Sequence, residues 1–95
     1  MKKAKNASEA QFLEQIPNIG KAVAEDLRIL KVTHPHQLKG QDGLELYRRL
    51  NHVTGIHHDP CMADTLMAAV DFMNGGMPKP WWHFTEKRKQ LLKIK

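Results

Sequence analysis

The side chains with the most reactive chemistry lie in one short run, residues 57–61, which reads His-His-Asp-Pro-Cys. Imidazole nitrogens and a thiolate are ligands that zinc prefers, so His58 and Cys61 form a candidate pair, with His52 or His83 as a further ligand. No second CxxC or HxxxH pair accompanies them, and the spacing does not match a zinc module. We expect no metal ion and no cofactor.

Asp59 and Cys61 also have a structural interpretation. Aspartate followed by proline is typical of a helix start, because the carboxylate caps the first amides and proline fits the first helical position. Cys61 would then lie in the first turn, where a lowered pKa would make its thiol reactive. A free cysteine is also commonly packed as a small apolar side chain. We expect a structural role and no catalytic residue.

The second candidate site is the turn at residues 16–21, which reads Ile-Pro-Asn-Ile-Gly-Lys. Apolar residues recur at helical spacing on both sides, which predicts two helices joined as an αα-hairpin. Asn18 stands where such turns commonly have glycine, and asparagine tolerates left-handed backbone. The amides that open the second helix lack intrahelical partners and could hold a phosphate. The predicted nucleic-acid-binding residues are Asn18, Ile19, Gly20, Lys21, Arg28 and Lys31.

The hairpin has a purely structural alternative, in which it only packs the first helix on the second. Hairpins that bind DNA commonly occur in pairs, and one clear copy is present here. Glu25 and Asp26 place negative charge in the middle of the second helix, whereas nonspecific binding of nucleic acid depends on positive charge. The sequence predicts the turn and leaves its use open.

Aromatic side chains gather near the C-terminal end, at Trp81, Trp82 and Phe84. They could stack on bases or dock a partner, with Lys79 and His83 beside them. Alternatively, they cover the most apolar helix of the chain, which needs a cover of this kind.

Helical periodicity and capping residues predict an all-α domain of about five helices. A capping box at Ser8 and Gln11 predicts a first helix that ends before Pro17. Asp42 and Gly55 are the expected start and stop of a middle helix. The remaining expected helices cover residues 21–31, 36–39 and 61–74, with a last helix from Thr85 after an extended segment at 77–84.

Length and charge limit what the chain can be. Its 95 residues form one domain, and a single cysteine excludes an intrachain disulfide. The formal charge is +5, yet residues 6–84 hold seven basic and nine acidic side chains. Positive charge therefore belongs to the ends, where residues 1–7 and 90–95 are expected to be flexible basic tails. No apolar run is long enough to span a membrane, and we expect a cytoplasmic protein.

From position 16 to position 88 the chain also resembles a known family. The matching stretches are IPNIGKAVAEDL, QLKGQDGLELYRRL, HDPC, AAVDFMNGG and PKPWWHFTEKRK. They resemble the small bacterial proteins of the pathogenicity-locus family, some of which are labelled mitomycin-resistance-like. The resemblance implies a compact, SAM-domain-like bundle of five helices with one helix-hairpin-helix element, for which DNA binding is the usual inference. The first half is also similar to the C-terminal domain of the competence regulator TfoX.

Two functions remain open. The first is a nucleic-acid-binding module that makes nonspecific contacts to DNA phosphates, in repair, competence or regulation. The alternative is a module for protein interaction or self-association, as a homodimer or with another protein, through residues 77–84 and without nucleic acid. The sequence has no paired carboxylates, nucleophile elbow or phosphate loop, so we expect no enzyme.

Overall fold

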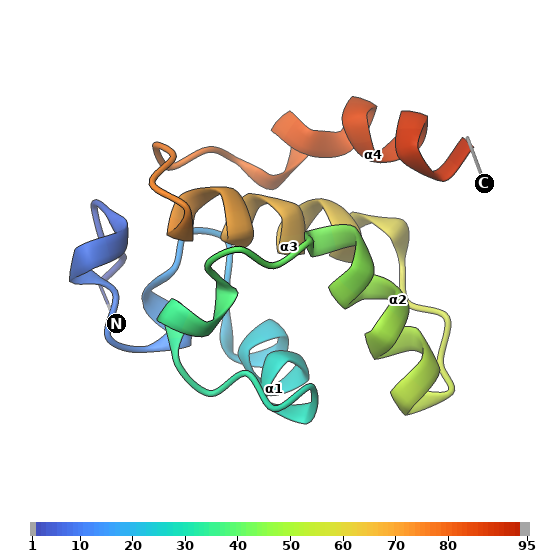
Figure 1. The fold of residues 1–95 in the computed structure, drawn as a ribbon, viewed down its shortest axis with the longest axis horizontal. Helices are drawn as coiled ribbons and strands as arrows, with labels where there is room; N and C mark the ends of the chain where they lie inside the picture. The colour runs from blue at the N-terminus through green and yellow to red at the C-terminus, as the bar shows by residue number, and fades with distance from the viewer. Residues whose placement is uncertain (1, 94–95) are drawn as a thin grey trace.

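The computed structural model describes residues 2–93, in which every regular element is a helix and no strand occurs (Figure 1). The predicted all-α class is confirmed. About five helices were predicted, whereas the described residues form four α-helices and four short 3-10 helices. In chain order they are η1 (Ala7–Glu9), η2 (Leu13–Gln15), α1 (Lys21–Ile29), η3 (Pro35–Leu38), α2 (Gly43–Thr54), α3 (Pro60–Met73), η4 (Trp81–Phe84) and α4 (Thr85–Lys93).

Helix α3 is the centre of the fold, with α4 on one side of it and α1 and α2 on the other (Figure 1). Asp59 caps it by accepting a hydrogen bond from the Cys61 amide at 2.8 Å, and Pro60 occupies the first helical position, as predicted. Most of its residues are buried, among them Leu66, Phe72 and Met73. The prediction that this is the most buried helix is confirmed.

Helix α2 lies unusually close to α3. A Cβ atom added to Gly43 would come within 2.5 Å of the Met67 Cα atom, so only glycine permits the contact. The ends of α2 are as predicted: the Asp42 carboxylate accepts hydrogen bonds from two amides of the first turn, and Gly55 ends the helix in left-handed conformation.

The predicted first helix, from Ser8 to the residue before Pro17, is wrong. Two separate 3-10 turns, η1 and η2, occupy this segment. The side chain of Gln15 folds back and accepts hydrogen bonds from the amides of Gln11 and Phe12 at 2.8 and 3.0 Å. Because Phe12 is extended, the backbone between the two turns is not helical. The helix-hairpin-helix element therefore lacks its first α-helix.

Two further segments differ from expectation. Of the segment 77–84, which was predicted to be extended, residues 81–84 form η4, and α4 follows without a break. The expected short helix at 36–39 is a 3-10 helix that begins at Pro35. Of the predicted basic tails, residues 1, 94 and 95 lie outside the described residues. Lys3 contacts the turn, the Ala4 amide donates to the Gln15 carbonyl, and residues 90–93 belong to α4.

A charged group inside α3 ties α4 to the core. Asp64 is fully buried, and its carboxylate accepts hydrogen bonds from Arg88 Nε at 2.8 Å and Nη2 at 3.3 Å. The Thr85 hydroxyl, at the start of α4, donates to the same carboxylate at 2.7 Å. The hydrogen bond to Asp64 raises the pKa of Arg88, so the guanidinium keeps its positive charge.

Replacing Arg88 with alanine should destabilise the fold by roughly 3 kcal/mol, because it leaves a buried carboxylate without its cation. Urea unfolding, followed by the change in midpoint, measures this. Arg28→Ala is the matched control, since Arg28 also pairs with a carboxylate but is 41% exposed. It should cost less than about 1 kcal/mol. Equal losses in the two variants would contradict the assignment.

Candidate nucleic-acid interface

The turn before α1 has the backbone that the sequence predicted. Asn18 adopts left-handed conformation, with φ of 73°. Ile19 is buried, and its amide donates to the Ile16 carbonyl at 3.1 Å, so this amide is not available to a ligand. Gly20 is the extended N-cap residue, and α1 begins at Lys21. Of the amides predicted to bind an anion, only those after Ile19 are therefore available.

The start of α1 is open. Gly20 offers no side-chain acceptor, and the first turn of the helix contains no acidic residue. A Cβ atom placed on Gly20 would meet nothing within 4 Å, so a ligand can approach the backbone here. The first amides of the helix and the positive end of its dipole face this opening.

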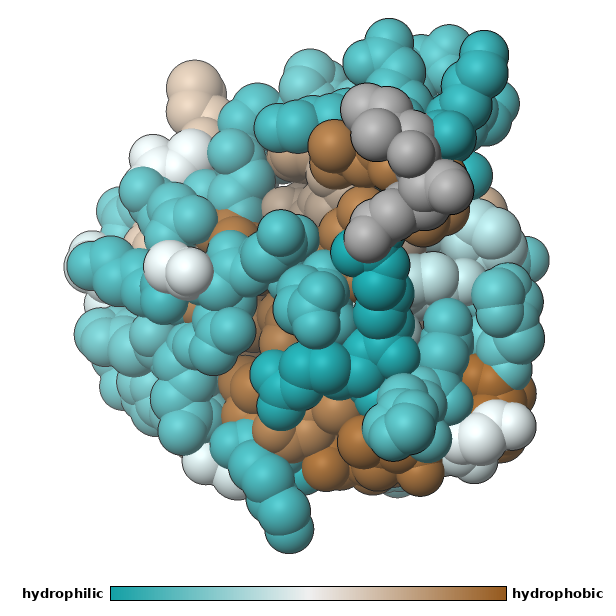
Figure 2. Space-filling view, turned by 45° about the vertical axis from the view of Figure 1, so that its right-hand side comes forward, coloured by the Kyte–Doolittle hydropathy of each residue, from teal (hydrophilic) through white to brown (hydrophobic). Residues whose placement is uncertain are grey.

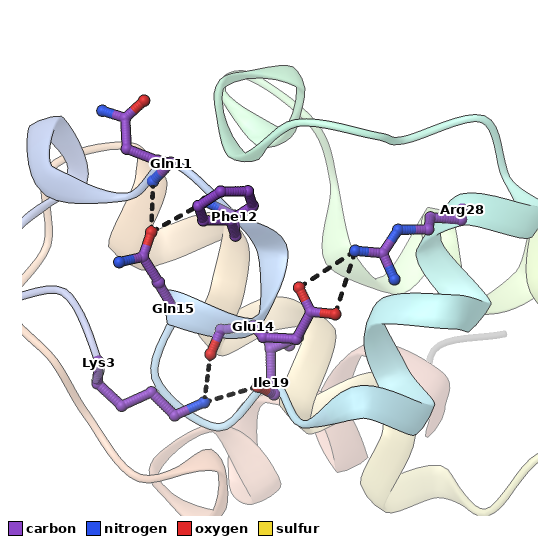
Figure 3. Close-up of polar contacts among 7 residues, drawn as sticks. All are labelled: Lys3, Gln11, Phe12, Glu14, Gln15, Ile19 and Arg28. Carbon is purple, nitrogen blue, oxygen red and sulfur yellow. Dashed lines mark hydrogen bonds and ion pairs between the residues drawn. The ribbon is translucent and has the colours of Figure 1, made fainter. Parts of the chain in front are cut away.

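Charged side chains of both signs surround the opening, and several of them interact with one another (Figure 3). Arg28 Nη2 lies 3.1 Å from both carboxylate oxygens of Glu14. A hydrogen bond from its own backbone and the Arg28 guanidinium lower the pKa of Glu14. The hollow at the helix start is lined by Lys3, Glu14, Ile19, Gly20, Lys21, Glu25 and Arg28. Three cations thus outnumber two carboxylates.

Lys3 closes the other side of the turn. Its ammonium group donates to the backbone carbonyls of Glu14 at 2.8 Å and Ile19 at 2.6 Å (Figure 3). It also donates to the Ile16 carbonyl at 3.2 Å. An ammonium group has three donors, and all of them are used here. Partial burial lowers the pKa of Lys3, an effect that the nearby Glu14 opposes. Sequence analysis missed this contact because it joins residues 11–16 positions apart.

The predicted binding residues do not all meet. Gly20, Lys21 and Arg28 line one hollow. Lys31 follows the other end of α1, in left-handed conformation with φ of 70°. The Asn18 side-chain amide is already used, because it donates to the Lys79 carbonyl at 2.7 Å. The structure thus separates Lys31 from the site and gives Asn18 a positioning role.

That hydrogen bond brings the turn next to the aromatic segment. Within it, Trp81 and Phe84 are half-buried, whereas Trp82 is 63% exposed. The rings of Trp81 and Trp82 meet edge to face, with centroids 5.6 Å apart. The three aromatic residues predicted as one group therefore divide into two that are partly covered and one that faces solvent.

The side chains of the 57–61 run have structural partners. The His58 ring and amide both bond to Asn51 Oδ1, at 2.7 and 2.9 Å, and the Tyr47 hydroxyl donates to the His58 carbonyl at 2.5 Å. Across residues 2–93 no three His, Cys, Asp or Glu side chains come close enough together to hold a metal ion.

Comparison with known proteins settles the family. The model of the pathogenicity locus family matches residues 6–90. The chain belongs to the pathogenicity locus family. A relative in Streptomyces lavendulae, named mitomycin resistance protein McrB, is 40% identical over 86 residues, which cover 90% of this chain and 82% of the relative. No solved structure matches the chain. The similarity to the TfoX domain stays a prediction.

In this member of the pathogenicity locus family, none of the described helices is long and apolar enough to cross a membrane.

The one cysteine of this family member is made less reactive by its surroundings. A hydrogen bond to the Asp59 carboxylate, with partial desolvation, raises the pKa of Cys61. This direction is opposite to the lowered pKa that a nucleophilic thiol in a first helical turn would have. The geometry thus favours the structural role for Cys61.

Alkylation of Cys61 tests this. The rate of reaction with iodoacetamide should have its midpoint at a higher pH in the folded protein than in the urea-unfolded chain, because only the thiolate reacts. Asp59→Ser keeps a side-chain cap but removes the carboxylate, so its midpoint should fall towards the unfolded value. A folded midpoint below the unfolded one would show an activated thiol instead.

Proposed function

We propose that this protein binds nucleic acid through the phosphate backbone, at the open start of α1, without a catalytic step. The observation that carries the proposal is the helix start itself. Gly20 caps it without a side chain, space in front of it is open, and the Lys21 side chain is exposed beside it. A helix N-terminus with free amides and an adjacent cation is a general binding site for phosphate.

Arg28 supports the proposal. It contacts Glu14 through Nη2 alone, and its other N–H groups have no partner among the described residues. A guanidinium has five donors, so Arg28 can bind a phosphate while it keeps Glu14 neutralised. Arg28 thus compensates the Glu14 carboxylate, whereas Glu25, which the sequence analysis named as opposing binding, has no ion-pair partner among the described residues.

The small number of cations sets the expected strength. Two or three phosphate contacts give a salt dependence with a slope of roughly −2 to −3 on a double logarithmic scale. Binding of this kind does not read base edges, so it should be nonspecific. Such binding is compatible with a role in DNA repair, competence or regulation. The name of the relative does not distinguish among these three roles.

Replacing Gly20 with aspartate should weaken binding strongly without harming the fold. Aspartate is a good N-cap residue and should stabilise α1 by a few tenths of a kcal/mol, while its carboxylate occupies the amides and repels phosphate. Fluorescence polarisation with labelled DNA at low salt should show at least about a tenfold loss of affinity. Urea unfolding should show unchanged or greater stability.

Two controls localise the site. Gly20→Ser caps the helix without charge and should lose less affinity than Gly20→Asp. Lys21→Glu and Lys31→Glu make the same charge change at opposite ends of α1, so Lys21→Glu should weaken binding more. Equal effects of the last two would refute a site at the helix start, and absence of binding by the unchanged protein at low salt would refute the proposal as a whole.

The second candidate function is association with protein, without nucleic acid. Exposed apolar side chains in the segment 77–84 favour it, since Met77 is 77% exposed and Trp82 is 63% exposed. Sedimentation at several concentrations distinguishes the two, because self-association raises the apparent mass and a monomer does not.

A further inference from the structure

We infer that the nucleic acid is single-stranded and that one of its bases stacks on Trp82. This inference rests on the proposed function and adds a second contact to it. Proteins that bind single strands combine cations along the backbone with aromatic side chains on which bases stack. The segment from Lys79 to Lys93 has both parts.

The backbone that carries Trp82 is ordered, although the indole faces solvent. The backbone of η4 closes with a hydrogen bond from the His83 amide to the Pro80 carbonyl at 3.0 Å, and the half-buried Trp81 ring lies against Trp82. Helix α4 follows directly and is fixed to α3 through the Asp64 carboxylate. An indole has only two side-chain torsions, so it loses little entropy when a ligand stacks on it.

The indole and the start of α1 lie within reach of one strand. The Asn18 side chain bonds to the Lys79 carbonyl, and Trp82 is three residues further along. Three residues span at most about 10 Å, so Trp82 lies near the turn that leads into Lys21. A strand whose phosphate binds at Gly20 can thus place a neighbouring base on the indole.

The charge on the helix that follows Trp82 favours nucleic acid over a protein partner. Lys89 and Lys93 are exposed on one face of α4, four residues apart, and neither forms an ion pair within residues 2–93. Hydrophilic side chains cover most of the face in Figure 2, and hydrophobic ones form a band from its middle to its lower edge. An interface for protein would deplete lysine and gather apolar surface at its centre.

A single strand fits better than a duplex. In a duplex each base is already stacked between its neighbours, and taking one out costs free energy. An unpaired strand offers its bases to an aromatic side chain at no such cost. The geometry therefore predicts a preference for single strands that the phosphate site alone would not give.

The test compares two labelled strands of about ten nucleotides by fluorescence polarisation, oligothymidylate and an abasic strand with the same number of phosphates. The protein should bind oligothymidylate roughly tenfold more tightly. Trp82→Ala should remove that difference and leave the abasic strand bound as before, whereas Trp82→Phe should retain most of it. Because Trp82 is exposed, the alanine variant should keep the urea midpoint of the unchanged protein.

Each other outcome has a distinct meaning. Equal affinity for the two strands would overturn stacking and leave the phosphate site intact. Failure to bind either strand would overturn both proposals. Self-association that Trp82→Ala abolishes, without binding of nucleic acid, would assign the indole to a protein contact. A higher affinity for the corresponding duplex than for oligothymidylate would also contradict the inference.

Discussion

The buried carboxylate of Asp64 is the constraint on which the rest of the structure depends. It lies in the most apolar helix, where a charge is tolerated only if it is paired and fully hydrogen-bonded. Arg88 and Thr85 meet this requirement, and both come from α4. If α4 separated from α3, the core would be exposed and the Asp64 carboxylate would lose its hydrogen-bond partners. The position of α4 in turn fixes η4, and the Lys79 carbonyl just before η4 holds Asn18 in the turn. One ion pair thus connects the core to the candidate interface.

The turn itself is held from two directions, with a consequence for its chemistry. On one side, Lys3 donates hydrogen bonds to three backbone carbonyls. On the other, the Asn18 side chain donates to the Lys79 carbonyl. Carbonyl oxygens repel phosphate, and the ammonium group neutralises those of the turn. The amides and the exposed Lys21 side chain remain on the outside, at the positive end of the helix. Residues 1–7 were predicted to be a flexible basic tail, yet Lys3 in this segment neutralises the carbonyl side of the turn.

Local signals in the sequence predicted the helices that have clear caps. The ends of α2 and the start of α3 depend on Asp42, Gly55 and the pair at 59–60. Each of these residues acts within one helical turn of its own position, so the sequence alone predicts its effect. The segment 8–16 could not be read in this way. Its buried residues, Ala10, Leu13 and Ile16, recur every three positions, which fits a 3-10 helix as well as an α-helix. The contacts of Lys3 and Asp64 join positions 11–24 apart, and residue types alone do not give such distances. Composition likewise could not separate exposed Trp82 from its half-buried neighbours.

The most direct test of the account is amide and indole NMR of the labelled protein during titration with a short oligothymidylate. The account predicts that the backbone signals of Gly20 and Lys21 and the side-chain signal of Trp82 shift together with a common affinity. The signal of Lys31, at the far end of α1, should stay in place. Shifts confined to other surfaces, or spectra unchanged at saturating strand and low salt, would contradict it.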